Sequence, residues 1–195
     1  MSQLWPVTLR HDEVTIRPMK VSDARRWHQL RLENQSWLQE WEASLPPESS
    51  ARALTYRQSA RKMLKDAKDG SCMPFIVEYQ GIVCGQLTVS GITFGSLRSC
   101  NFGYWIAQDF AGRSIMTTAV ALVTDHLFYS VNLHRVEVAI RPENIPSNRL
   151  VVRLGFELEG LRKQFLHING EWRDHNIYVL RRDQVTTSRI SQLNK

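Results

Sequence analysis

One segment, residues 100–140, constrains the fold more than any other part of the chain. It begins with a run of β-forming residues that ends at Ala107, continues through an apolar helix that starts at Gly112, and ends in the short run RVEVAI from Arg135. The helix is apolar on several faces, so it should be largely buried. A strand, a crossover helix and a second strand give a parallel pair with a right-handed connection. Ligands of open sheets bind at the carboxyl ends of such strands, so we expect a cleft there.

The part of the chain before this unit predicts a strand and two helices. The strand runs over Val14–Met19, and Ser22 or Asp23 can cap the helix that follows. A proline-rich stretch then interrupts the pattern. A second helix should start at about Ser50 and stop at Gly70.

Strands make up most of the remainder. The runs PFIVEY and IVCGQLTVSGI flank the turn Gln80-Gly81, and CNFGYWIA follows as a third antiparallel strand. A helix with Pro146 in its first turn precedes a final hairpin, which turns at Asn169-Gly170. The predicted order is β-α-α-β-β-β-α-β-α-β-β, an α+β fold with a mixed, mostly antiparallel, seven-stranded sheet and about four helices.

The composition predicts one soluble domain. With 195 residues, 43% of them hydrophobic, the chain is long enough for one hydrophobic core. We assign residues 1–183 to that domain and expect the polar segment 184–195 to be a flexible tail. The first residues, MSQLWPVTLRHDE, carry charges and a proline where a signal peptide has an apolar run, and no later apolar run approaches about 18 residues. We therefore expect a cytoplasmic protein without a membrane partner.

Charge and metal-binding side chains exclude further classes of protein. The formal net charge of +6 suits an anionic ligand or RNA-rich surroundings, because positive potential attracts anions. The basic residues are scattered, however, which favours solvated faces over a patch for sequence-specific nucleic-acid binding. Cys72, Cys84 and Cys100 lack C-x-x-C spacing and the histidines are dispersed, so neither a metal site nor a disulfide framework is predicted.

Several motifs stand in a fixed relative order along the chain. They are GYWIA before GRSIMT, then PEN, a serine and LGF, and their order and the element order resemble the GCN5-related N-acetyltransferases, the GNAT superfamily, over about residues 14–181. The stretches NQSWLQEWE, HRVEVAIRPENIPSNRLVVRLGFELEG and NGEWRDHNIYVL are similar to the RimJ type, the ribosomal-protein alanine N-acetyltransferases. The resemblance implies the GNAT fold and an enzyme that binds acetyl-CoA, without a metal, and passes its acetyl group to an amine.

The resemblance also implies a cofactor site. In the family, a loop at a helix N-terminus binds the CoA pyrophosphate through backbone N–H groups; here it is Ala111–Met116, and its residues 111, 114 and 116 depart from the family pattern. An ordinary helix cap at Ser114 is the alternative. The strand GYWIA should lend backbone groups to the pantetheine arm, and Asn144 its amide unless it only begins a helix. The expected cofactor-binding residues are Tyr104, Trp105, Ile106, Gly112, Arg113, Ser114, Ile115, Met116, Thr117 and Asn144.

Direct attack by the amine is the favoured chemistry, because no cysteine has a recognisable base beside it in the sequence. A protein α-amine, with a pKa of about 7.7–8.0, needs little base catalysis. Glu137 is the candidate base, acting through water; alternatively it faces solvent or pairs with Arg135. The superfamily's acidic tyrosine is replaced by Val151. Ser147, which matches a serine of the ribosomal-protein branch, is the candidate donor to the CoA sulfur, unless it is only a first-turn residue.

The acceptor site is expected on two segments. Trp37 and Trp41 could wall a groove for a peptide or fasten their loop to the domain. Trp172 and Asp174 lie beside the final turn, where Asp174 could instead pair with Arg173. The resemblance implies acetylation of the N-terminal alanine of a ribosomal protein, which is compatible with ribosome association. A small-molecule amine, such as an antibiotic or aminoacyl conjugate, and an inactive ribosome-associated binding module are the alternatives.

Overall fold

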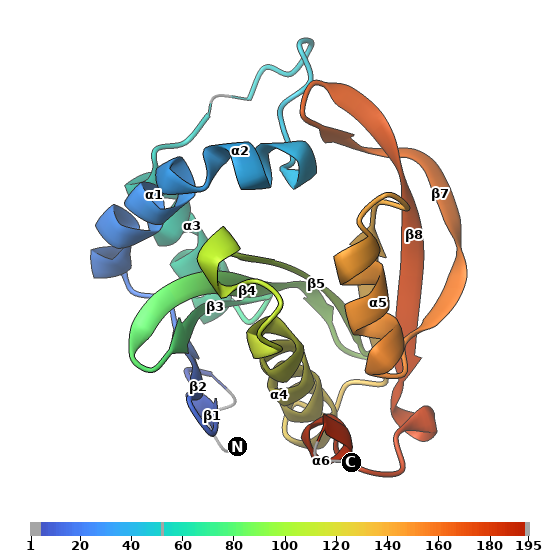
Figure 1. Ribbon diagram of the computed structural model, residues 1–195. Helices are drawn as coiled ribbons and strands as arrows, with labels where there is room; N and C mark the ends of the chain where they lie inside the picture. The colour runs from blue at the N-terminus through green and yellow to red at the C-terminus, as the bar shows by residue number, and fades with distance from the viewer. Residues whose placement is uncertain (1–4, 52, 194–195) are drawn as a thin grey trace.

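The computed structural model describes residues 5–51 and 53–193, which form an eight-stranded sheet with helices on both faces (Figure 1). The strands are β1 (Leu9–His11), β2 (Val14–Pro18), β3 (Cys72–Tyr79), β4 (Ile82–Thr93), β5 (Ser99–Ile106), β6 (Arg135–Ile140), β7 (Glu157–Ile168) and β8 (Glu171–Arg181). The α-helices are α1 (Ala24–Glu33), α2 (Gln35–Leu38), α3 (Tyr56–Lys68), α4 (Ile115–Tyr129), α5 (Ile145–Arg153) and α6 (Arg189–Leu193). The strand order is β1-β2-β3-β4-β5-β6-β8-β7.

The predicted α+β class is confirmed, but the predicted element counts were too low. Within the described residues there are eight strands and six α-helices. The missed strand, Leu9–His11, has three residues and is too short to show alternation. The helix expected from Ser50 begins at Tyr56 instead. There, Thr55 and Gln58 form a capping box in which each side chain accepts the backbone N–H of the other residue.

The parallel pair of strands separates after three residues. Ser99–Asn101 of β5 pair with Arg135–Glu137 of β6, and the register ends there. Beyond Asn101, β5 stays paired with β4, while β6 pairs along its whole length with β8. The carboxyl-terminal half of β5 therefore has one side without a neighbouring strand, and we call the space between it and β6 the gap.

Two hydrophobic clusters fix the helices on opposite faces of the sheet. Phe75 of β3 and Leu87 of β4 belong to the larger cluster, which includes α4 and Val151 of α5. The neighbouring residue Ile76 points the other way and packs with Trp27 of α1 and the start of α3. The two groups of helices are seen across the sheet in Figure 1.

The segment from residue 184 onward, expected to be a flexible tail, carries α6. The carboxylate of Asp125 in α4 accepts hydrogen bonds from the backbone N–H groups of Arg189 and Ile190, at 2.7 and 3.1 Å. Arg189 is buried, and its guanidinium donates to the carbonyl oxygens of Leu154 and Thr187. These contacts attach α6 to α4 and to the end of α5.

Candidate active site

The loop before α4 combines a left-handed backbone with unpaired donors. Gly112 has a φ of +74° and Ser114 a φ of +58°. Ser114 directly precedes the helix, which begins at Ile115 rather than at Gly112, and its side chain makes no capping hydrogen bond. The first N–H groups of a helix lack partners within it, and in the described part of the chain no carbonyl accepts those of Ile115, Met116 and Thr117. Three donors at the positive end of the helix dipole are therefore available to an anion.

The side chains of this loop divide between core and surface. Ile115 and Met116 are buried in the larger cluster, so the methionine does not cover the N–H groups. Arg113 is exposed, and its guanidinium lies 5.7 Å from the centre of the Phe110 ring. The loop thus combines backbone donors that no carbonyl accepts with one exposed guanidinium, which suits a phosphate group.

The gap exposes backbone groups of β5. The N–H of Ala107 donates to the Cys84 carbonyl of β4 at 2.8 Å. Because backbone groups alternate sides along a strand, Trp105 also faces β4, whereas Tyr104 and Ile106 face the gap. The indole N–H of Trp37 donates to the Ile106 carbonyl at 3.0 Å. The N–H of Ile106 and both backbone groups of Tyr104 remain for a molecule that lies in the gap.

Tyr104 and Ser147 meet at the start of α5. Burial raises the pKa of Tyr104 well above its usual value, and the nearby Ser147 hydroxyl opposes part of that rise. The tyrosine hydroxyl is buried and has no hydrogen-bond partner at normal distance among the described residues. Asn144 caps α5, because its side-chain oxygen accepts the Ser147 N–H at 3.2 Å. Two hydroxyl groups therefore lie side by side near the gap.

A second helix residue, Asn148, which was not among the predicted site residues, fixes this region. Its amide donates to the carbonyl oxygens of Arg141 and Asn144, at 3.0 and 2.7 Å. Its side-chain oxygen accepts from the Tyr178 hydroxyl of β8 at 2.8 Å. The available signal was an asparagine two residues after Pro146, in the first turn of the helix. Asn148 therefore holds the α5 N-terminus against the loop after β6.

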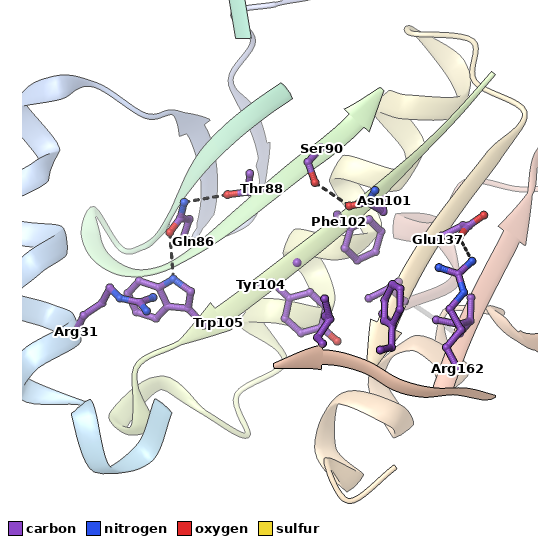
Figure 2. Close-up of a pocket in the computed structure, with 16 residues that line it drawn as sticks. Arg31, Gln86, Thr88, Ser90, Asn101, Phe102, Tyr104, Trp105, Glu137 and Arg162 are labelled. Atoms are coloured by element: carbon purple, nitrogen blue, oxygen red, sulfur yellow. Dashed lines mark hydrogen bonds and ion pairs between the residues drawn. The ribbon is translucent and has the colours of Figure 1, made fainter. Parts of the chain in front are cut away.

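On the face that carries α1, a cavity of about 500 Å³ extends across several strands of the sheet (Figure 2). Apolar and polar side chains both line it, and we call it the polar cavity after the polar ones. Its lining comes from α1 and strands β4 to β8: Arg31, Gln86, Thr88, Ser90, Asn101, Phe102, Gly103, Tyr104, Trp105, Glu137, Val138, Ala139, Arg162, Phe165, Leu166 and Ile177. Tyr104 packs in the larger cluster on the opposite face and still lines the cavity. The polar cavity therefore reaches the gap between β5 and β6.

Hydrogen bonds order one wall of the polar cavity. The indole N–H of Trp105 donates to Gln86, which in turn donates to Thr88, at 3.1 and 2.9 Å. Ser90 donates to the side-chain oxygen of Asn101 at 2.7 Å. Figure 2 shows these contacts on neighbouring strands. The sequence signal for this wall is the stretch GQLTVS, in which three polar residues alternate with buried Leu87 and Val89.

Glu137 lies at the opposite end of the polar cavity and is also ion-paired. Its carboxylate accepts from Arg135 at 2.6 Å, and Arg162 of β7 lies 3.7 Å from its other oxygen. The candidate base thus lines the cavity and also makes the Arg135 contact that was its alternative. The carboxylate is oriented from both sides.

None of the four residues expected to bind the acceptor lines the polar cavity. Trp37 binds the Ile106 carbonyl, and Trp41 packs under the guanidinium of Arg141, 5.1 Å from its ring. Trp172 is 53% exposed. Asp174 does not pair with Arg173, whose guanidinium contacts Glu171 at 2.7 Å.

Asp174 instead holds a bulge in β7. Its carboxylate accepts the backbone N–H of Gln164, which has a φ of +46°. The pairing of β7 with β8 shifts register between Arg162 and Leu166, around this residue. The bulge determines which side chains of β7 face the cavity. Asp174 therefore positions Arg162 and Phe165 indirectly, through the bulge.

The cysteines lie outside this chemistry. Burial raises the pKa of Cys72 to about 11 and the pKa of Cys84 and Cys100 to about 12. A thiol with so high a pKa is a poor nucleophile near neutral pH. Among the described residues, no group of three or more His, Cys, Asp or Glu side chains could hold a metal ion, and no helix could cross a membrane.

A sheet that divides after one parallel pair, with free N–H donors at the crossover helix and a polar cavity reaching the gap, defines an acyltransferase of the GNAT fold. A family model described as "Acetyltransferase (GNAT) domain" matches residues 13–157. The chain therefore belongs to the GNAT family of acetyltransferases and is an N-acetyltransferase.

Individual relatives agree with this assignment. The chain is 29% identical over 181 residues to a "[Ribosomal protein uS5]-alanine N-acetyltransferase" of Escherichia coli, covering 92% of this chain and 93% of that protein. It is 29% identical over 182 residues to the "Probable N-acetyltransferase YjcK" of Bacillus subtilis, covering 88% and 96%. The solved structure of Mycobacterium smegmatis RimJ in complex with CoA-disulfide superposes with a TM-score of 0.89 at 33% identity, covering 100% and 96%.

Proposed function

We propose that this enzyme transfers the acetyl group of acetyl-CoA to the N-terminal α-amine of a protein, with a ribosomal protein that begins with alanine as the foremost acceptor. The proposal rests on the shape of the polar cavity. The cavity is lined from β4 to β7, and neighbouring strands lie about 4.8 Å apart, so it is roughly 15–20 Å across. That span accommodates about five residues of extended peptide, at about 3.4 Å each. The name of the E. coli relative supports the same acceptor.

We place acetyl-CoA on the opposite face, where it supplies the activated acetyl group. The N–H groups of Ile115, Met116 and Thr117 would bind its pyrophosphate. The backbone groups of Tyr104 and Ile106 would pair with the amide-bearing arm in the gap, as an added strand does. In this arrangement the residues where the gap meets the polar cavity would surround the acetyl group.

The chain's own groups then move the protons. A fraction of the α-amine, with a pKa of about 7.7–8.0, is neutral at pH 7 and can attack directly. Glu137 would take the proton that the amine nitrogen loses, through water, because its carboxylate lines the same cavity. Ser147 and Tyr104 would donate hydrogen bonds to the leaving sulfur. The raised pKa of Tyr104 keeps its hydroxyl protonated, and thus a donor, at every working pH.

Labelled acetyl-CoA tests the proposal directly. The enzyme is incubated with a peptide that begins with alanine, with the same peptide acetylated at its N-terminus, and with a panel of small amines. We expect label in the free peptide and none in the blocked peptide. Label only in small amines would contradict a protein acceptor. Calorimetry with acetyl-CoA alone tests separately whether the cofactor binds. An inactive binding module need not bind acetyl-CoA, so a titration without heat would favour that alternative.

A further inference from the structure

Glu137 and Arg162 form an ion pair inside the polar cavity. Arg162 is the more loosely held of the two residues. Glu137 contacts Arg135 at 2.6 Å but Arg162 at 3.7 Å. The Arg162 side chain is 49% exposed, whereas that of Glu137 is 25% exposed. Arg162 has a second partner, since its guanidinium lies 4.9 Å from the centre of the Phe165 ring. A half-exposed ion pair at this distance contributes little and can exchange partners at low cost.

The other arginines around the polar cavity are fixed. Arg31 contacts Glu42 at 2.5 Å and stacks on Trp105, and its side chain is 19% exposed. Arg135 is also 19% exposed and donates two hydrogen bonds to Glu159. Arg162 is therefore the cavity guanidinium that can change its partner most easily. Figure 2 shows it beside Glu137, at the end of the cavity away from Arg31.

We propose that this pair selects acceptor peptides with an acidic side chain at the second or third residue. The α-ammonium group of the peptide replaces Arg162 at the outer oxygen of Glu137. The released guanidinium then binds the acidic side chain of the same peptide, so that one ion pair is exchanged for two complementary ones. The bulge in β7 places Arg162 on the cavity side, next to Phe165. This inference rests on the proposed peptide acceptor and specifies its class.

Two peptides that differ in one charge test the inference. Ala-Asp-initiated and Ala-Asn-initiated peptides have nearly the same shape, and a second pair carries the Asp or Asn at the third position. We measure kcat/KM for wild type, Arg162→Gln, Arg162→Lys and Arg57→Gln. Arg57 is exposed on α3, outside the polar cavity, and serves as the matched control.

Wild type should favour the Asp peptide of at least one pair by about fivefold, as expected for a half-exposed ion pair. The ratio should fall to about one in Arg162→Gln, stay above one in Arg162→Lys and remain unchanged in Arg57→Gln. Added salt should reduce the wild-type preference, because the new pair stays partly exposed. Equal rates for Asp and Asn peptides in wild type, or a preference retained in Arg162→Gln, overturn the inference and leave the proposed function standing. If no peptide is acetylated while small amines are, the proposed function falls and takes the inference with it.

Discussion

The loop before α4 could bind phosphate through its backbone N–H groups or through the Ser114 hydroxyl. Replacing Ser114 by glycine distinguishes these two possibilities. Ser114 has a φ of +58°, and a residue other than glycine pays about 1–2 kcal/mol in the left-handed region. Glycine removes that strain but loses about 0.5–1 kcal/mol through its greater freedom in the unfolded chain. We therefore expect a net stabilisation of about 0.5–1 kcal/mol, or an increase in Tm of about 1–4 °C for a chain of this size. If the backbone N–H groups bind the pyrophosphate, the Kd for acetyl-CoA should not rise.

Thermal unfolding and calorimetric titration with acetyl-CoA measure both quantities. Ser130→Gly is the matched control: the same chemical change at the other end of α4, where φ is −100° and glycine brings no relief of strain. It should lower the Tm slightly and leave the Kd unchanged. A tenfold or greater loss of affinity in Ser114→Gly alone would show that the hydroxyl is a phosphate ligand and would refute the account based on backbone donors.

Three further predictions follow from the site. Glu137→Gln and Ser147→Ala should each lower kcat without unfolding the protein; for Glu137→Gln the loss should be about tenfold at pH 7 and smaller at pH 9, where the α-amine is already neutral. If either variant keeps the wild-type rate throughout a pH series, the replaced residue does not have the proposed role. Asp174→Ala should raise the peptide KM and leave the Kd for acetyl-CoA unchanged, because the bulge at Gln164 loses the carboxylate that accepts its N–H; equal effects on both constants would contradict this positioning role. Burial lowers the pKa of His175 below its usual 6.5, so the unfolded chain binds a proton first as the pH falls, and stability should decline below about pH 6.5. Urea unfolding at pH 7.5 and 5.5 should show that decline in wild type and a smaller one in His175→Asn.

The elements that the sequence predicts well are those whose pattern is long and local. The βαβ unit was predicted because its buried helix carries apolar residues over four turns and both flanking strands are β-rich. The three-residue β1 and the four-residue α2 carry too little pattern to be recognised. The helix α3 begins later than predicted because Thr55 and Gln58, and not Ser50, form its cap.

The cofactor side and the proposed acceptor side of the site differ in the same respect, namely how local their sequence patterns are. The proposed phosphate-binding loop is one continuous stretch of chain, so its motif places Gly112 and Ser114 together. The proposed acceptor side is assembled from five strands and α1, and the bulge around Gln164 decides which residues of β7 face it. No local pattern contains that register shift. Trp37 was predicted to wall a peptide groove because it is an aromatic residue in a polar loop, whereas its indole N–H donates to the Ile106 carbonyl.

The separation of the parallel strands explains how one sheet could bring acetyl-CoA and the proposed peptide acceptor together. Tyr104 belongs to the face with α4 and α5, and Trp105, the next residue, to the face with α1. A molecule bound at α4 and one bound in the polar cavity therefore approach β5 from opposite sides. They can meet only where β6 has moved away, beyond the Asn101 and Glu137 pairing. Glu137 is the last residue of β6 paired with β5 and the first beside the gap. In the proposed reaction a carboxylate at this position would lie near the incoming amine, whereas the side chains that would contact the rest of the peptide lie further along, on β7.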